Sequence, residues 1–141
     1  DSIQSYVRTI ELNPNWAAPH SNLGIVFRRT QKLEEALAEF QRAVELAPKE
    51  ATYHASLANC YRQLDREAEA TAQMQIVQKL LKEKNEYDRA CCAALLGEIE
   101  EALSLLKTAL EQKQASLEWA RRDVDFDFIR DDPRFKASVG E

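Results

Sequence analysis

The chain has 141 residues and a net charge of -5, with 45% apolar and 30% charged residues. This length allows one compact domain or one short solenoid, and this balance allows a buried core under a charged surface. The mild negative charge disfavours nucleic acid as a general partner. No apolar run approaches the ~20 residues of a membrane span, and no charged-then-apolar signal segment opens the chain.

The first predicted helix ends before Pro14, because the residue before a proline disfavours the helical conformation. Its apolar residues have the i, i+3, i+4, i+7 spacing of one helical face and are Ile3, Tyr6, Val7 and Ile10. Asn15 is predicted to cap a second helix, whose apolar face centres on Leu23 and Phe27. A turn near residues 30–32 leads to a third, strongly amphipathic helix that Pro48 ends.

The same cycle then occurs twice more. A fourth helix carries His54, Leu57, Ala58 and Tyr61 on one face. A turn at about Asp65 follows, and the fifth helix is expected to continue to about Lys84 because no proline stops it. The sixth helix covers about residues 87–94, Gly97 makes the next turn, and the seventh helix covers about 99–110. The predicted elements therefore form antiparallel helix pairs.

Equivalent residues recur at a fixed step along these helices. The step is 34 residues for the pairs Tyr6/Phe40, Thr9/Ala43, Pro14/Pro48, His20/His54 and Phe27/Tyr61. It shortens to 32 for the pairs Leu64/Leu96, Ala70/Ala102 and Met74/Leu106. A fixed period of this size is typical of stacked helix pairs, which build an α-solenoid.

The pattern changes after residue 115. Ser116 and Asp132 are predicted to cap two short helices, and Pro133 suits the first position of the second one. Between them, residues 123–129 concentrate acidic and aromatic side chains. Because the end of a solenoid exposes an apolar face, we expect these segments to fold back onto the last full pair as capping helices.

These positions resemble the tetratricopeptide repeat family, whose motif places small, aromatic and proline residues at set offsets. The first full repeat matches with His20, Leu23, Gly24, Phe27, Ala36, Phe40, Ala43 and Pro48. The resemblance implies an all-α, right-handed α-solenoid of antiparallel helix pairs. Its expected parts are the second helix of a truncated repeat (1–14), repeats at 15–48 and 49–82, a degenerate repeat at 83–114, and capping helices at 115–141. The last part resembles the closing segment of bacterial members of the family.

The resemblance also implies a concave groove lined by the first helix of each pair. The candidate partner-binding residues are Ser21, Asn22, Ile25, Arg28, Arg29, Ala55, Asn59, Arg62, Gln63 and Tyr87. Three arginines in this groove would form a basic strip on an acidic protein and favour an acidic peptide as the partner. The alternative is that these arginines lie in the last turns of their helices and only complement the helix dipole.

No catalytic residue, cofactor or metal site is predicted. His20 and His54 occupy equivalent packing positions, and the acidic run from Asp123 to Asp132 lacks the glycine turn and final glutamate of a calcium loop. Cys60, Cys91 and Cys92 are odd in number and are read as buried packing residues in a reducing compartment, hence a cytoplasmic protein. A redox or metal role for the cysteines is the alternative.

The predicted function is therefore a non-catalytic scaffold that holds a peptide or helix of a protein partner. Because the chain begins at Asp1 inside a predicted helix, we expect a piece of a longer protein. One alternative is a regulatory module of a larger enzyme. Another is self-assembly, a homodimer formed through Ile3, Tyr6 and Ile10 of an exposed first helix.

Overall fold

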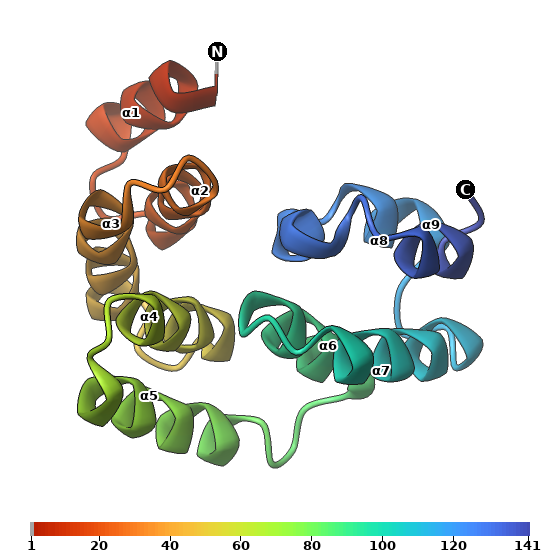
Figure 1. Cartoon of the computed structure of the whole chain (residues 1–141). Helices are drawn as coiled ribbons and strands as arrows, with labels where there is room; N and C mark the ends of the chain where they lie inside the picture. The colour runs from red at the N-terminus through yellow and green to blue at the C-terminus, as the bar shows by residue number, and fades with distance from the viewer. Residues whose placement is uncertain (1) are drawn as a thin grey trace.

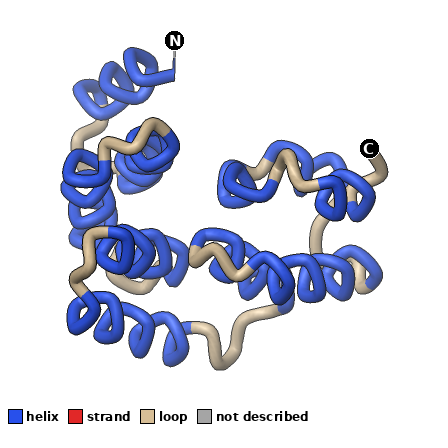
Figure 2. The backbone as a smooth tube through the Cα atoms, in the orientation of Figure 1, coloured by secondary structure: helices blue, strands red, loops and turns tan. Residues whose placement is uncertain are grey.

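The computed structural model describes residues 2–141, and these form helices joined by short loops, with no strand among them (Figures 1 and 2). The helices in chain order are α1 Ser2–Leu12, α2 Ala17–Arg29, α3 Leu33–Leu46, α4 Ala51–Gln63, α5 Glu67–Leu80, α6 Glu86–Leu95, α7 Ile99–Glu111, α8 Leu117–Arg122, the 3₁₀ helix η1 Val124–Ile129 and α9 Pro133–Ser138. The predicted all-α solenoid is confirmed. Within the described residues no helix is long and apolar enough to cross a bilayer.

Three helix pairs, α2/α3, α4/α5 and α6/α7, make up the solenoid, and α1 packs on α2. Each pair turns at a residue with left-handed backbone, namely Gln31 (φ 65°), Asp65 (φ 60°) and Gly97 (φ 80°). These residues follow one another at the 34- and 32-residue steps of the sequence. The repeat in the sequence is therefore also a repeat of backbone conformation.

The close approach of α2 to α3 depends on Gly24. A Cβ placed there would lie 2.7–2.9 Å from three ring atoms of Phe40, which is fully buried. The ring of Phe40 thus occupies the space that any larger residue at position 24 would need.

Two predicted helix boundaries are wrong. The cap of α2 is Trp16 and not Asn15, because Asn15 lies inside a turn closed by the Trp16 N–H donating to the Asn13 carbonyl at 3.1 Å. The fifth helix ends at Leu80 and not at about Lys84. Beyond it, Arg89 donates to the carbonyls of Leu81, Lys82 and Lys84 and holds the chain in turns.

The C-terminal segments close the far end of the solenoid, as capping helices do. Phe126, Ile129, Phe135 and Val139 are buried together with apolar residues of α6 and α7 in a second core. The Phe126 ring lies edge-on to Tyr87 at 5.8 Å between centroids and 5.5 Å from the Phe135 ring. As predicted, the Ser116 and Asp132 side chains accept hydrogen bonds at the starts of α8 and α9.

The stacking of the pairs is uneven along the solenoid. The second helix of the first pair, α3, packs against α4 of the next pair. At the following step α6 packs mainly against α4, whereas α5 makes few contacts with α6 (Figure 1). The early end of α5 and the loop that follows it therefore separate α5 from the third pair.

Candidate functional site

The concave face, formed by α2, α4 and α6 on the inner side of the curve in Figure 1, is the candidate site. A later segment of the same chain contacts this face. After α7 it turns back, so that η1 packs against α6 and also contacts α2. In Figure 1 this blue C-terminal segment faces the orange α2 across the open side of the curve.

Arg28, near the end of α2, is held by residues far away in the sequence. Its side chain is buried, donates to the Leu95 carbonyl at 2.9 Å, and stacks over the Phe128 ring at 3.7 Å from the centroid. Burial lowers the pKa of Arg28 to about 10, so the guanidinium stays charged at neutral pH. A carbonyl and an aromatic face both favour this cation, although its Nε atom has no hydrogen-bond partner.

The neighbouring Arg29 makes the second contact between α2 and η1. It donates to an oxygen of Asp127 at 2.6 Å. The Arg29 side chain is 50% exposed, whereas that of Asp127 is 17% exposed. We call the two interactions, Arg28 on Phe128 and Arg29 on Asp127, the closing contact, because they join the first full repeat to the C-terminal segment.

Two other predicted groove residues donate hydrogen bonds to carbonyls at the C-terminal end of α6. Asn59 donates to the Leu95 carbonyl at 2.9 Å, and Arg62 donates to the Leu96 carbonyl at 3.4 Å. The last carbonyls of a helix have no partners within it and carry partial negative charge. Donors from α2 and α4 satisfy them here. Arg28 and Arg62 do lie in the last turns of their own helices, as the alternative interpretation predicted, and in addition they donate to the last carbonyls of a helix in a later pair.

The predicted groove residues differ in what surface they offer. Ser21, Ile25, Arg28, Ala55, Asn59 and Tyr87 are buried. Asn22 and Arg62 are half-buried, and Arg29 and Gln63 are exposed. In this conformation only the half-buried and exposed residues, Asn22, Arg62, Arg29 and Gln63, have surface for a partner. That they contact a partner stays a prediction.

Tyr87 belongs to a polar cluster between α6 and η1. Its hydroxyl donates to Asp123 at 2.6 Å, and the Cys91 thiol donates to the same oxygen at 3.9 Å. Cys91, Asp123 and Asp125 each place one potential metal-ligand atom within 4.8 Å of the others. The other Asp123 oxygen accepts from the Asp125 N–H and caps η1. Because both oxygens of Asp123 already accept hydrogen bonds, capping and pairing with Tyr87 account for the cluster.

The three cysteines are free and buried, as predicted. Burial raises the pKa of Cys60 to about 11, with Arg28 opposing the shift, and raises the pKa of Cys91 and Cys92 further. Nearby carboxylates, Asp125 first among them, add to the shift at Cys91 and Cys92. A thiol that keeps its proton is a poor nucleophile, which disfavours the redox alternative.

The two histidines are buried at equivalent positions, as the packing interpretation predicted. The Nδ1 atom of His20 lies 2.8 Å from a Glu39 oxygen, and that of His54 lies 2.6 Å from a Gln73 oxygen. In both cases the ring joins the first helix of a pair to the second. Each histidine thus has the same structural role in its repeat.

Asp127 and Phe128 are not among the predicted groove residues. The available signal is the acidic and aromatic run at 123–129, for which the sequence predicts only a capping role. Neither periodicity nor spacing could place this run opposite Arg28 and Arg29, which are about 100 positions earlier in the chain. The contact depends on how sharply the solenoid curves.

The first helix was expected to expose Ile3, Tyr6 and Ile10 for self-assembly. All three are half-buried, while Val7 and Leu12 are exposed. A homodimer through this helix stays a prediction.

Comparison with known proteins agrees with this architecture. Residues 17–50 match the tetratricopeptide repeat family. The fold is similar to the crystal structure of YrrB, described as a TPR protein with an unusual peptide-binding site, with a TM-score of 0.54 and 22% sequence identity. The match covers 97% of this chain and 74% of that one. No curated protein matches. The bacterial source, the cytoplasmic location and the absence of catalysis and cofactors stay predictions.

Proposed function

We propose that the concave face of this helical solenoid, in which residues 17–50 match the tetratricopeptide repeat family, binds an acidic, aromatic peptide of a partner protein. The family consists of interaction scaffolds, and this chain shares their architecture. The concave face also offers a cation to a ligand, since the Arg29 side chain is 50% exposed.

The single observation that carries the proposal is the closing contact. The end of α2 already holds an acidic and an aromatic side chain, Asp127 and Phe128, supplied by the chain itself. An ion pair and a cation–π interaction are the interactions that a partner peptide of the same chemistry would make. The internal segment thus indicates the ligand class.

A partner would compete for Arg28 and Arg29 without unfolding the C-terminal segment. Phe126 and Ile129 fix η1 in the second core, where they are 0% and 1% exposed. Asp127 and Phe128 are only half-buried and lie on the side of η1 that meets α2. Because Asp127 and Phe128 belong to the same chain as α2, their effective concentration at α2 is high. A partner peptide therefore has to bind more tightly than they do, or to bind a chain in which the closing contact has already opened.

The test uses a fluorescein-labelled peptide with the sequence of residues 123–131 and a second one in which both phenylalanines are alanine. In the variant Asp127→Asn/Phe128→Ala, the closing contact is weakened while Phe126 and Ile129 remain. We expect this variant to bind the first peptide at least about tenfold more tightly than the unmodified chain, by fluorescence anisotropy. It should bind the second peptide weakly.

Adding Arg29→Glu to the opened variant should abolish binding, because it reverses the exposed charge that the peptide needs. Arg29 suits this test better than Arg28, which also holds the Leu95 carbonyl and is needed for packing. Asp131→Asn, at an exposed carboxylate, is the matched control and should leave affinity unchanged. Failure of the correctly folded opened variant to bind the first peptide would overturn the proposal.

A further inference from the structure

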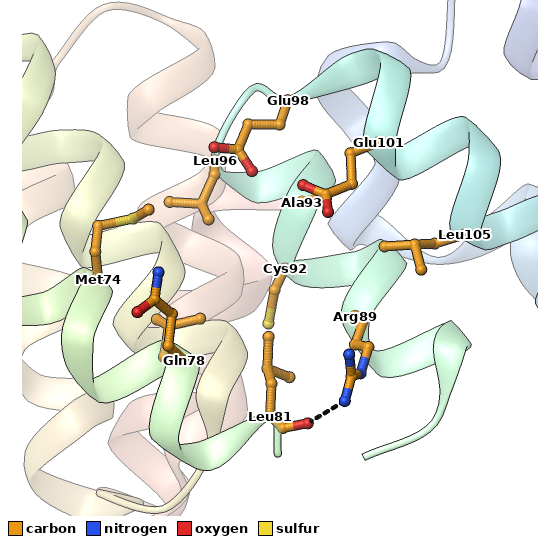
Figure 3. Close-up of a pocket in the computed structure, with 11 residues that line it drawn as sticks. Met74, Gln78, Leu81, Arg89, Cys92, Ala93, Leu96, Glu98, Glu101 and Leu105 are labelled. Carbon is orange, nitrogen blue, oxygen red and sulfur yellow. Dashed lines mark hydrogen bonds between the residues drawn. The ribbon is translucent and has the colours of Figure 1, made fainter. Parts of the chain in front are cut away.

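A pocket of about 300 Å³ lies where α5 separates from the third helix pair (Figure 3). Its floor is apolar and includes Val77 on α5 and Cys92, Ala93 and Leu96 at α6, all buried. Met74 and Leu81 contribute from the α5 side. We call it the α5–α7 pocket. Its volume is at the lower end of ligand pockets and suits a short peptide segment with one or two side chains.

Two carboxylates, Glu98 and Glu101, lie together at one end of this pocket (Figure 3). Among the described residues neither takes part in a salt bridge. Partial burial first, and then Glu101, raise the pKa of the Glu98 carboxyl, and Arg62 opposes the shift. Arg62 directs its donors to the Leu96 carbonyl and the Met74 sulfur instead. Two exposed acids thus share one end of a pocket that has an apolar floor.

In the second repeat, an arginine and a glutamate occupy the positions that are equivalent to Glu98 and Glu101. Residue 66 corresponds to residue 98, because Arg66 caps α5 and Glu98 caps α7. Arg66 pairs with Glu69 at 2.8 Å, three residues on, in the second repeat. The third repeat keeps the second acid as Glu101 but has Glu98 in place of the arginine. The ion pair of the second repeat is thus replaced by a pair of acids in the third. Arg62 acts on Glu98 electrostatically but forms no salt bridge with either acid among the described residues, so both are available to pair with a cation of another molecule.

The other charged residue of the pocket does not supply that cation. Arg89 lies at the opposite end, where its guanidinium donates to the Leu81 carbonyl at 3.0 Å and to two other carbonyls of the loop (Figure 3). Through these hydrogen bonds it holds the loop after α5 in place at this end of the pocket. The pocket thus combines an apolar floor, a fixed wall and an acidic end.

We propose that the α5–α7 pocket binds a peptide segment of a partner protein in which a lysine or arginine is flanked by aliphatic residues. The cation would lie between Glu98 and Glu101, and the aliphatic side chains would cover Val77, Cys92 and Leu105. This site is separate from the concave face and has the opposite charge preference. Its ligand would therefore not compete for the closing contact.

The probe is a fluorescein-labelled Ser-Gly-Leu-Arg-Leu-Gly-Ser peptide, compared with one in which glutamate replaces the arginine and one in which serine replaces both leucines. Binding to the full chain is measured by anisotropy and mapped by amide chemical shifts. We expect the first peptide alone to bind, with shifts confined to α5, α6 and the start of α7.

The variant Glu98→Arg recreates the ion pair of the preceding repeat within the chain. It should lower affinity for the arginine peptide by at least about tenfold and leave the fold intact, because position 66 accepts an arginine in the same setting. Glu101→Gln should also weaken binding, whereas Glu34→Gln/Glu35→Gln, at the exposed start of α3, should have no effect.

Equal binding of the arginine and glutamate peptides would overturn the proposal, as would unchanged affinity in Glu98→Arg. Shifts that map to α2 and η1 would also overturn it, because they would place the peptide at the concave face. Since the concave-face test uses acidic peptides and Arg29, the two proposals fail independently.

Discussion

The guanidinium of Arg28 lies 3.7 Å from the centre of the Phe128 ring, although 100 positions separate the two residues in the sequence. Together with the ion pair between Arg29 and Asp127, this contact links the first full repeat to the C-terminal segment. Val124 and Phe128 of η1 also pack against the first core, which contains Ile25 and Ala55. Opening of the concave face therefore requires that these contacts break together.

Removing the Phe128 ring should destabilise the fold modestly and in a way that depends on Arg28. We expect Phe128→Ala and Arg28→Ala to show a coupling free energy of about 1–2 kcal/mol in a double-mutant cycle measured by urea unfolding, as for a partly desolvated cation–π pair. Phe27→Ala with Arg28→Ala is the control pair, since Phe27 has no such contact with Arg28. A coupling near zero for Arg28 and Phe128 would mean that the contact contributes nothing to stability.

Gly24→Ala should destabilise the chain by about 1–3 kcal/mol, because the new methyl group would overlap the buried Phe40 ring. The later repeats have Ala58 with Met74 and Ala90 with Leu106 at the equivalent positions. The cost of Gly24→Ala should therefore fall in the background Phe40→Leu. Chemical denaturation of the two single variants and the double variant measures this. Additive effects would rule out the ring as the cause.

Asp125 should make stability depend on pH. Burial, and then the carboxylates of Asp123, Glu50 and Asp127, raise its pKa to about 8, while a hydrogen bond with Cys91 opposes the shift. A carboxyl whose pKa is higher in the folded than in the unfolded chain holds its proton better when folded. Its stabilising effect is complete below about pH 4 and is lost as the pH rises to about 8.

Asp125→Asn should therefore raise the melting temperature by a few degrees at pH 8 and by less at pH 5, a difference that thermal unfolding followed by circular dichroism detects. Asp131→Asn, at an exposed position, is the control and should show no such pH dependence. An equal gain at both pH values would mean that protonation of Asp125 is not linked to folding.

The three cysteines should resist modification in the folded chain. Because burial raises the pKa of each thiol and excludes reagent, we expect labelling by 5,5′-dithiobis(2-nitrobenzoic acid) at pH 8 to be at least about a hundredfold slower than in 6 M guanidinium chloride. Cys60→Ala identifies the contribution of that thiol. Rapid labelling of any one cysteine in the native chain would restore the redox alternative.

Local patterns in the sequence predicted most of the helices and their pairing. Spacing of apolar residues placed seven helices, and the caps at Ser116 and Asp132 located the two short ones. The end of α5 escaped prediction because Arg89, from the following helix, holds the loop after it. Such a hydrogen bond leaves no trace in the periodicity of α5 itself.

The candidate site was only partly predictable. The family resemblance directed attention to α2, α4 and α6, and Arg28, Arg29, Asn59 and Arg62 lie where the first two of these helices meet other elements. Their actual partners, the last carbonyls of α6 and the side chains of η1, are 34 or more positions away. The burial of Ser21, Ile25 and Ala55 likewise depends on neighbouring helices that a repeat motif does not describe.

The sequence by itself determined that the chain is a solenoid of helix pairs with a 34-residue step, because periodicity and small-residue positions act through contacts within and between neighbouring helices. Only the tertiary structure decided that η1 returns to α2 and that α5 separates from the third pair. Both depend on small rotations between successive pairs, which accumulate along the solenoid. The closing contact and the α5–α7 pocket follow from that accumulated geometry.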